Sequence, residues 1–179
     1  MRFGFHAQSH GSENQAAEDA YRILRADALW AEHSGFDYLS VQDHLIPFSK
    51  TGRPDAPLLD SWTALGAIAE ATSSIGLLPL VINASVRHPS LIAKASASLD
   101  VVSGGRMSLG IGAGGYRPEH DTHGIPYPSA SDRIARLSES VQIIRLLWRT
   151  TEATFRGNHH HLNTATISPR PVHQPNVLV

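Results

Sequence analysis

The chain has 179 residues, enough for one folded domain, and its 41% hydrophobic and 17% charged residues are typical of a globular protein. Its 15 basic and 16 acidic residues give a formal net charge of −1, so we expect no nucleic-acid partner and no membrane binding. The absence of cysteine excludes disulfides, thiolate metal sites and cysteine nucleophiles. The sequence shows neither a signal peptide nor an apolar run near the roughly 20 residues that span a bilayer, so we expect a cytoplasmic protein.

Short apolar runs alternate with longer segments of helical periodicity along the chain. In chain order, the pattern predicts a strand at 3–6, a helix at 14–33, a strand at 38–41, a helix at 61–72, a strand at 75–82, a helix between His88 and Ser103, a strand at 107–111, a helix from Ser129, a hairpin at 154–159 and a fifth strand at 176–179. Long loops are expected at 42–59 and 112–128. The buried helix faces are expected to comprise Ala20, Leu24, Ala28 and Ala31 in the first helix and Ile134, Leu137, Val141, Ile144 and Trp148 in the last.

This alternation predicts a parallel sheet covered by helices, either an open doubly wound sheet or a (β/α)8 barrel. Residues 110–115 carry the G-x-G-x-x-G spacing of dinucleotide folds, in which the turn opens directly into a helix. A loop rich in proline and glycine is expected here instead. The glycines would let this loop approach a ligand closely, which favours an α/β fold of the TIM-barrel type.

A complete barrel of this type needs roughly 250 residues. Residues 1–179 are therefore expected to form a single domain with about the first half of the barrel, truncated at strand five. A half-barrel would leave strands one and five with unpaired edges, which proteins seldom leave uncovered. We expect either a fragment of a longer protein or a wall supplied by a second copy, and a homo-oligomeric dimer is the predicted assembly.

Polar residues follow the expected strands at the edge where barrels carry their function. His6 follows strand one and is expected either to line the barrel or to contact a ligand. Asp43 and His44 follow strand two and combine a carboxylate acceptor with a group that titrates near neutral pH, which favours catalysis over a solvated loop pair. The glycines that follow strand four, at 112–115, suit either backbone contact with a ligand or a tight turn.

Two further histidine segments are expected to be structural. His88 precedes Pro89 and is expected near the start of a helix. Imidazoles are common metal ligands, but the histidines at 159–161 lie on an expected surface hairpin without neighbouring carboxylates. No metal site is predicted.

Seven segments in order along the chain carry a recognisable pattern. They lie at 36–45, 87–94, 99–106, 109–114, 124–128, 132–133 and 169–172. The first, which ends in Asp43-His44-Leu45, resembles the G-F-D-x-(L/V)-x-V-x-D-H segment of the bacterial-luciferase-like superfamily of flavin- and F420-dependent oxidoreductases. The whole set resembles the N-terminal portion of that superfamily and is closest to its deazaflavin-dependent branch.

The resemblance implies a TIM-type barrel that binds coenzyme F420, or alternatively FMN, at its mouth. It implies that Asp43 contacts the cofactor ring and that His44 exchanges a proton with the substrate. The residues that it places at the cofactor are Asp43, Pro79, Leu80, Gly112, Ala113, Gly114 and Gly115. At Pro79-Leu80, relatives often carry a non-proline cis peptide.

The same resemblance bears on the substrate. Phe48 stands where members that oxidise a sugar phosphate place a tryptophan beside the substrate, so Phe48 is expected, with His6, to contact the substrate. Those members also place a glutamate acid/base where this sequence has Ala113, and this departure argues against sugar-phosphate oxidation.

We therefore expect an F420-dependent oxidoreductase that transfers a hydride between the deazaflavin and a small organic substrate. One alternative is an FMN-dependent monooxygenase of the same fold, and another is a non-catalytic half-barrel fragment. A metal-dependent hydrolase barrel would need His-x-His at the end of strand one, where the sequence has only His6.

Overall fold

The computed structural model describes residues 1–7, 16–47 and 56–179. The strands are β1 (Gly4–His6), β2 (Tyr38–Val41), β3 (Gly76–Pro79), β4 (Ile82–Asn83), β5 (Leu109–Gly112), β6 (Ala153–Arg156), β7 (His161–Ala165) and β8 (Val177–Leu178). The helices are α1 (Asp19–His33), α2 (Ser61–Ala71), α3 (Pro89–Val102), α4 (Arg117–His123) and α5 (Ala130–Arg149). Within the described ranges, no helix has both the length and the apolar character needed to cross a bilayer.

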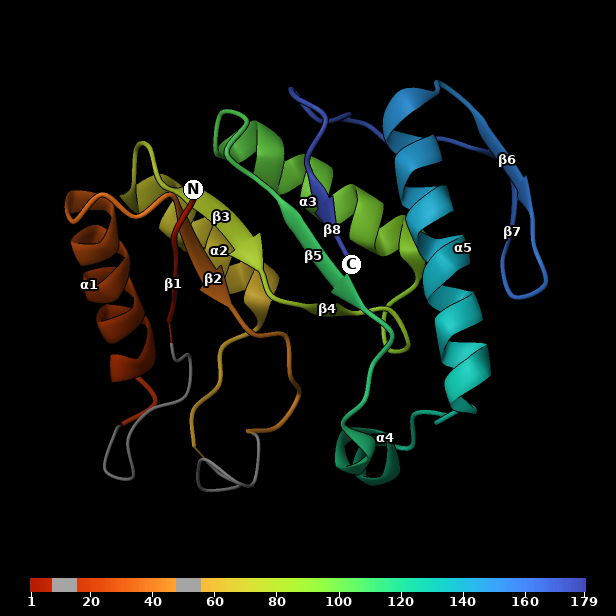
Figure 1. Ribbon diagram of the computed structural model, residues 1–179, viewed down its shortest axis with the longest axis horizontal. Helices are drawn as coiled ribbons and strands as arrows, with labels where there is room; N and C mark the ends of the chain where they lie inside the picture. The colour runs from red at the N-terminus through yellow and green to blue at the C-terminus, as the bar shows by residue number, and fades with distance from the viewer. Residues whose placement is uncertain (8–15, 48–55) are drawn as a thin grey trace.

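The central strands pair in parallel and form the sheet seen between the helices in Figure 1. One section has the order β1-β2-β3 and the other the order β4-β5-β8. A parallel bridge between Leu77 and Met107 joins the two sections. Among the described residues, β1 and β8 each pair with a single strand, so the sheet stays open between them. The parallel α/β architecture is confirmed, and the described part of the chain does not close a barrel.

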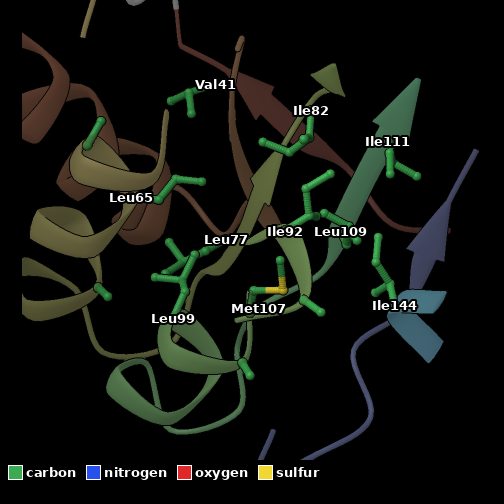
Figure 2. Close-up of a cluster of buried hydrophobic side chains, with 14 of the residues drawn as sticks. Val41, Leu65, Leu77, Ile82, Ile92, Leu99, Met107, Leu109, Ile111 and Ile144 are labelled. Carbon is green, nitrogen blue, oxygen red and sulfur yellow. The ribbon is translucent and has the colours of Figure 1, made fainter. Parts of the chain in front are cut away.

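One hydrophobic core joins the sheet to its helices. The strand residues Leu77 and Leu109 are fully buried. Side chains from three helices meet them, among them Leu65 from α2, Ile92 from α3 and Ile144 from α5 (Figure 2). Burial of this apolar surface is the main favourable contribution to folding and holds the strand ends in place.

Three helices begin where their capping residues predict. The Asp60 side chain accepts a hydrogen bond from a backbone N–H in the first turn of α2. His88 does the same for α3, and Ser129 does so for α5. The prediction that His88 stands at a helix start is confirmed.

Several predicted bounds differ from the structure. α1 begins at Asp19 rather than at residue 14, although the predicted buried face of this helix is confirmed. The predicted strand at 75–82 is divided into β3 and β4 because Leu80 and Val81 lie outside the parallel pairing. Ile134 was wrongly placed on the buried face of α5, since its side chain is 62% exposed. The first turns of α5 extend beyond the core, so helical spacing alone overstates their burial.

The helix α4 corrects the expected loop at 112–128. It begins at Arg117, two residues after Gly115, with Pro118 in its first turn and Gly124 in the left-handed conformation at its C-terminus. A helix therefore does start close to the G-x-G-x-x-G spacing, contrary to the argument used to set aside a dinucleotide fold. The short helix depends on burial of Glu119 and His120, which a scan for apolar periodicity does not detect.

Glu32 connects the last turn of α1 to the segment that leads into β3. Its Oε1 accepts hydrogen bonds from the backbone N–H groups of Ser73, Ser74 and Ile75 at 2.6–3.0 Å. Burial alone would raise the pKa of Glu32, but these hydrogen bonds lower it to about 2. The ionised carboxylate therefore stabilises this junction.

Replacing Glu32 with glutamine is expected to lower the free energy of unfolding near neutral pH but to have little effect near pH 2. The pKa of Glu32 is depressed in the folded state, so its contribution is present above the unfolded value of about 4.3 and is lost as the pH falls towards 2. Urea unfolding at several pH values measures the difference. The exposed Glu70→Gln change in α2 is the control, and a Glu32→Gln effect that is independent of pH would contradict the prediction.

Candidate active site

The candidate residues gather at one edge of the sheet because parallel strands place their carboxyl ends together. His6 ends β1, Asp43 and His44 follow β2, Pro79 ends β3 and Gly112 ends β5. Figure 1 shows α4 beyond the same edge. In barrel proteins this is the edge that carries catalytic residues.

Asp43 is buried and lies at the centre of an ion-pair network whose other members, Arg87 and Asp60, are partly exposed. Its Oδ1 accepts hydrogen bonds from Ser61 Oγ and from Arg87 Nη2, each at 2.8 Å. Its Oδ2 accepts from Arg87 Nε at 3.1 Å and from the Asn83 backbone N–H at 3.3 Å. Arg87 also donates to Asp60 at the start of α2, at 2.8 Å. The network therefore joins the ends of β2 and β4 to the segments that begin α2 and α3.

His44 pairs with a different carboxylate. Its Nδ1 lies 2.9 Å from Glu119 Oε1, which also accepts the Leu45 backbone N–H at 2.7 Å. This hydrogen bond with Glu119 raises the pKa of His44 above its usual value, although burial opposes the rise. Burial alone would raise the pKa of Glu119, but the hydrogen bonds from His44 and Leu45 lower it. The result is a carboxylate–imidazole pair at the carboxyl edge of the sheet.

Sequence reasoning did not find either partner. The sequence places Arg87 at the start of a helix and of the family-like segment 87–94, and Glu119 in the expected loop at 112–128, and it gives neither residue a role at the site. The available signals were weak: a cation four residues after a strand end, and an acid in the first turn of a short helix. The sequence places Asp43 and His44 next to each other, but the structure gives their side chains separate partners.

The glycine-rich turn after β5 packs against the neighbouring strands. A Cβ on Gly112 would collide with Val81, and one on Gly114, which has a φ of 77°, would collide with Asn83. Protein packing therefore requires both glycines. Gly115 differs, because it is exposed and a Cβ there would meet no atom within 4 Å. Of these three glycines, Gly115 is the one that faces open space.

The segment between β3 and β4 lies beside this turn. The Leu80–Val81 peptide bond is cis, one bond beyond the pair for which the resemblance implied such a feature. Pro79 is buried, whereas the side chains of Leu80 and Val81 are 42% and 40% exposed. The Ala113 carbonyl accepts a hydrogen bond from Ser85 Oγ at 2.6 Å, which holds the turn against the residues after β4. Leu80 and Val81 thus give an exposed apolar surface beside the last residues of β5, where a Cβ on Gly110 or Gly112 would meet them.

The two residues predicted to contact substrate have different positions. His6 is exposed, and its Nδ1 lies 2.9 Å from Ser40 Oγ on the adjacent strand β2. His6 lies at the carboxyl edge of the sheet, as predicted, and its contact with a ligand stays a prediction. Phe48 lies outside the described residues.

The cavities at the two ends of the sheet differ greatly in volume. A cavity of about 10 Å³ between Asp43, His44 and Glu119 is too small for a cofactor or substrate. Cavities of about 590 and 450 Å³ lie at the amino ends of the strands, where Arg2 and Tyr38 line both. Of the predicted site residues that the structure describes, none lines these two cavities.

The histidine segment at 159–161 does have a carboxylate neighbour, contrary to expectation. Glu139 on α5 accepts backbone N–H groups of Asn158, His159 and His160, and its Oε2 lies 3.3 Å from His160 Nδ1. These contacts attach the β6–β7 hairpin to α5. Among the described residues, no group of three or more His, Asp or Glu is placed to hold a metal ion.

Comparison with known sequences shows a match over the entire chain. The family of luciferase-like monooxygenases matches residues 1–179. Curated relatives include F420-dependent glucose-6-phosphate dehydrogenases of Beutenbergia cavernae, 36% identical over 162 residues, and of Amycolatopsis mediterranei, 34% identical over 162 residues. These alignments cover 90% of this chain but only 47% and 48% of the relatives. The chain spans about half the length of the curated relatives it matches.

Solved structures show the same relation. An F420-dependent secondary alcohol dehydrogenase with an F420–acetone adduct has a TM-score of 0.83 and 25% identity, over 98% of this chain and 51% of that one. Monooxygenase RslO1 from Streptomyces bottropensis has a TM-score of 0.84 and 26% identity, over 99% of this chain and 52% of that one. An FMN-bound 3,6-diketocamphane monooxygenase component from Pseudomonas putida, at 21% identity and a TM-score of 0.76, shares the fold alone. The described sheet thus corresponds to part of a luciferase-like TIM barrel.

Replacing Arg87 with methionine is expected to destabilise the fold by about 2–4 kcal/mol, because it leaves the buried Asp43 carboxylate without its cation. Combining the change with Asp43→Asn should recover part of the loss, since the uncompensated charge is then removed. The free energy of unfolding in urea measures both effects. Arg22→Met, which breaks an exposed ion pair with Asp19, is the control and should cost under about 1 kcal/mol. Equal losses from Arg87→Met and Arg22→Met would contradict the buried network.

Proposed function

Because this chain belongs to the luciferase-like monooxygenase family, we propose that it forms the part of an F420-dependent oxidoreductase that holds the cofactor ring and the proton-transferring histidine. The observation that carries the proposal is the His44–Glu119 pair at the carboxyl edge of the sheet. The names of the curated relatives and of the F420-dependent secondary alcohol dehydrogenase support the choice of cofactor.

The residues at this edge fit one face of a flat ring. Leu80 and Val81 offer exposed apolar side chains, and Gly115 leaves open space where another residue would place a Cβ. A bound deazaflavin would supply or accept a hydride. The protein's own contribution is to orient the reactants and to keep water away from them.

His44 is proposed to accept the substrate proton during oxidation and to donate it during reduction. When a secondary alcohol is oxidised, its C–H bond would give up a hydride to the bound deazaflavin, the O–H proton would pass to His44, and the C=O bond would form. The Glu119 carboxylate favours the protonated imidazole that results, in line with the raised pKa of His44. In the reverse direction, the same group returns the proton.

Asp43 is proposed to act chiefly by holding the neighbouring segments, and with them His44, in place. The resemblance implies contact with the cofactor ring, and that contact stays a prediction. Both of its carboxylate oxygens already accept hydrogen bonds, from Ser61, Arg87 and Asn83. These contacts favour a role in holding the edge on which His44 sits.

The substrate is proposed to be a small organic alcohol or carbonyl compound. The relatives' names make glucose 6-phosphate one compound to test, although Ala113 at the place of their acid/base glutamate argues against it. The alcohol dehydrogenase adds a simple secondary alcohol. The runner-up is an FMN-dependent monooxygenase of the same fold, and the monooxygenase RslO1, whose structure is similar, supports the oxygenase part of this alternative.

Titration of the purified chain with F420 and, separately, with FMN tests the proposal. Saturable binding of F420, seen as a change in deazaflavin fluorescence and tighter than binding of FMN, is the expected result. Saturable binding of FMN alone would replace the proposal with the monooxygenase. Binding of neither would overturn it in favour of a non-catalytic fragment.

Replacing His44 with alanine is expected to lower turnover by roughly 10²–10⁴-fold, with little change in the dissociation constant of the cofactor. The reason is that the change removes a proton acceptor and leaves the apolar surface for the ring intact. Steady-state kinetics and the fluorescence titration measure the two quantities. His33→Ala, at an exposed position in the last turn of α1, is the control. Equal losses in turnover and cofactor affinity would make His44 a binding residue.

The dimer expected from the sequence also stays a proposal. Sedimentation equilibrium of the purified chain measures the assembly directly. A mass of twice that of the chain is the expected result, and a stable monomer over a range of concentrations would contradict it.

A further inference from the structure

Glu119 is a carboxylate in an unusual place. It lies in the first turn of α4, a helix of seven residues, and is only 1% exposed. Burial of a charged carboxylate is costly unless hydrogen-bond donors compensate it. The role of Glu119 is therefore best inferred from the groups that donate to it.

The hydrogen bonds to Glu119 determine which ring nitrogen of His44 carries the proton. Glu119 Oε1 accepts the Leu45 backbone N–H at 2.7 Å and lies 2.9 Å from His44 Nδ1, with Ile46 N–H more distant at 3.5 Å. These hydrogen bonds favour the ionised carboxylate, which can only accept. Nδ1 of His44 must then carry a proton. In the neutral imidazole, the lone pair that can accept a proton is consequently on Nε2.

The other groups around His44 that the structure describes do not offset its pairing with Glu119. Asp43 adds a second negative charge nearby, which also favours protonation of His44. Arg87, which lines the same small cavity, is paired with both Asp43 and Asp60. The Tyr116 ring, just before α4, meets the His44 ring edge to face with centroids 5.8 Å apart. Glu119 Oε1, at 2.9 Å from Nδ1, hydrogen-bonds the imidazole directly.

We propose that Glu119 is a positioning residue that holds His44 as the Nδ1–H tautomer and thereby assigns proton exchange with the substrate to Nε2. The catalytic part of this inference rests on the proposed function. The tautomer and the coupling between Glu119 and His44 are properties of the chain without cofactor, so they can be tested separately.

Long-range ¹H–¹⁵N correlation spectra of the full chain, without cofactor and above the His44 pKa, test the tautomer. The His44 signals, assigned by comparison with His44→Ala, are expected to show a protonated Nδ1 and an unprotonated Nε2. Protonation of Nε2 instead would overturn the proposal. This measurement on the unaltered chain is decisive even if variants of Glu119 fail to fold.

Titration of His44 in Glu119→Gln tests the coupling. The amide keeps the shape of the side chain but removes its charge, so the His44 pKa is expected to fall by about one unit or more. Glu70→Gln, at an exposed position in α2, is the matched control and should leave the pKa of His44 unchanged. A Glu119→Gln chain in which His44 titrates as in the unaltered chain would overturn the proposal.

The pH profile of kcat/KM separates positioning from simple structural support. In Glu119→Gln, the limb that reports the essential base is expected to move to lower pH by the same amount as the His44 titration. Loss of activity at all pH values without that displacement would overturn the catalytic part. If neither F420 nor FMN binds, the proposed function fails, while the tautomer and titration results still decide the structural part.

Discussion

Parallel pairing of the strands is the constraint on which the site depends. Each helix returns the chain to the same end of the sheet, so every strand delivers its last residues to one edge. His44 and the glycine turn after β5 meet there although about 70 residues separate them in sequence. The hydrophobic core beneath them holds the strand ends together (Figure 2).

Carboxylates join segments that are remote from one another in sequence. Glu32, Asp43, Glu119 and Glu139 each accept several hydrogen bonds, mostly from segments remote in sequence. Glu32, Glu119 and Glu139 each accept two or more backbone N–H groups where regular pairing stops and these donors would otherwise be left without partners. Asp43 accepts one backbone N–H and three side-chain hydrogen bonds. Carboxylates that accept several hydrogen bonds therefore stabilise the fold away from the site and supply negative charge within it.

Local signals made much of the fold predictable. The bounds of β2 and the first residue of α3 follow from an apolar run and from a capping residue before proline. The break between β3 and β4 and the helix α4 were missed because both depend on contacts with other segments. The resemblance indicated His44, but its partner Glu119 lies 75 residues away and cannot be inferred from spacing.

The electrostatic environment of His44 follows from how the surrounding charges are paired. Asp43 is adjacent in sequence, yet its charge is compensated by Arg87 at hydrogen-bond distance, which weakens its effect on other groups. Glu119 instead points its charge directly at the imidazole, and a contact at 2.9 Å outweighs a more distant, compensated one. The carboxylate that holds α4 against the end of β2 is thus also the one that sets the proton affinity of His44. Stability of this edge and the basicity of its histidine are therefore coupled through a single side chain.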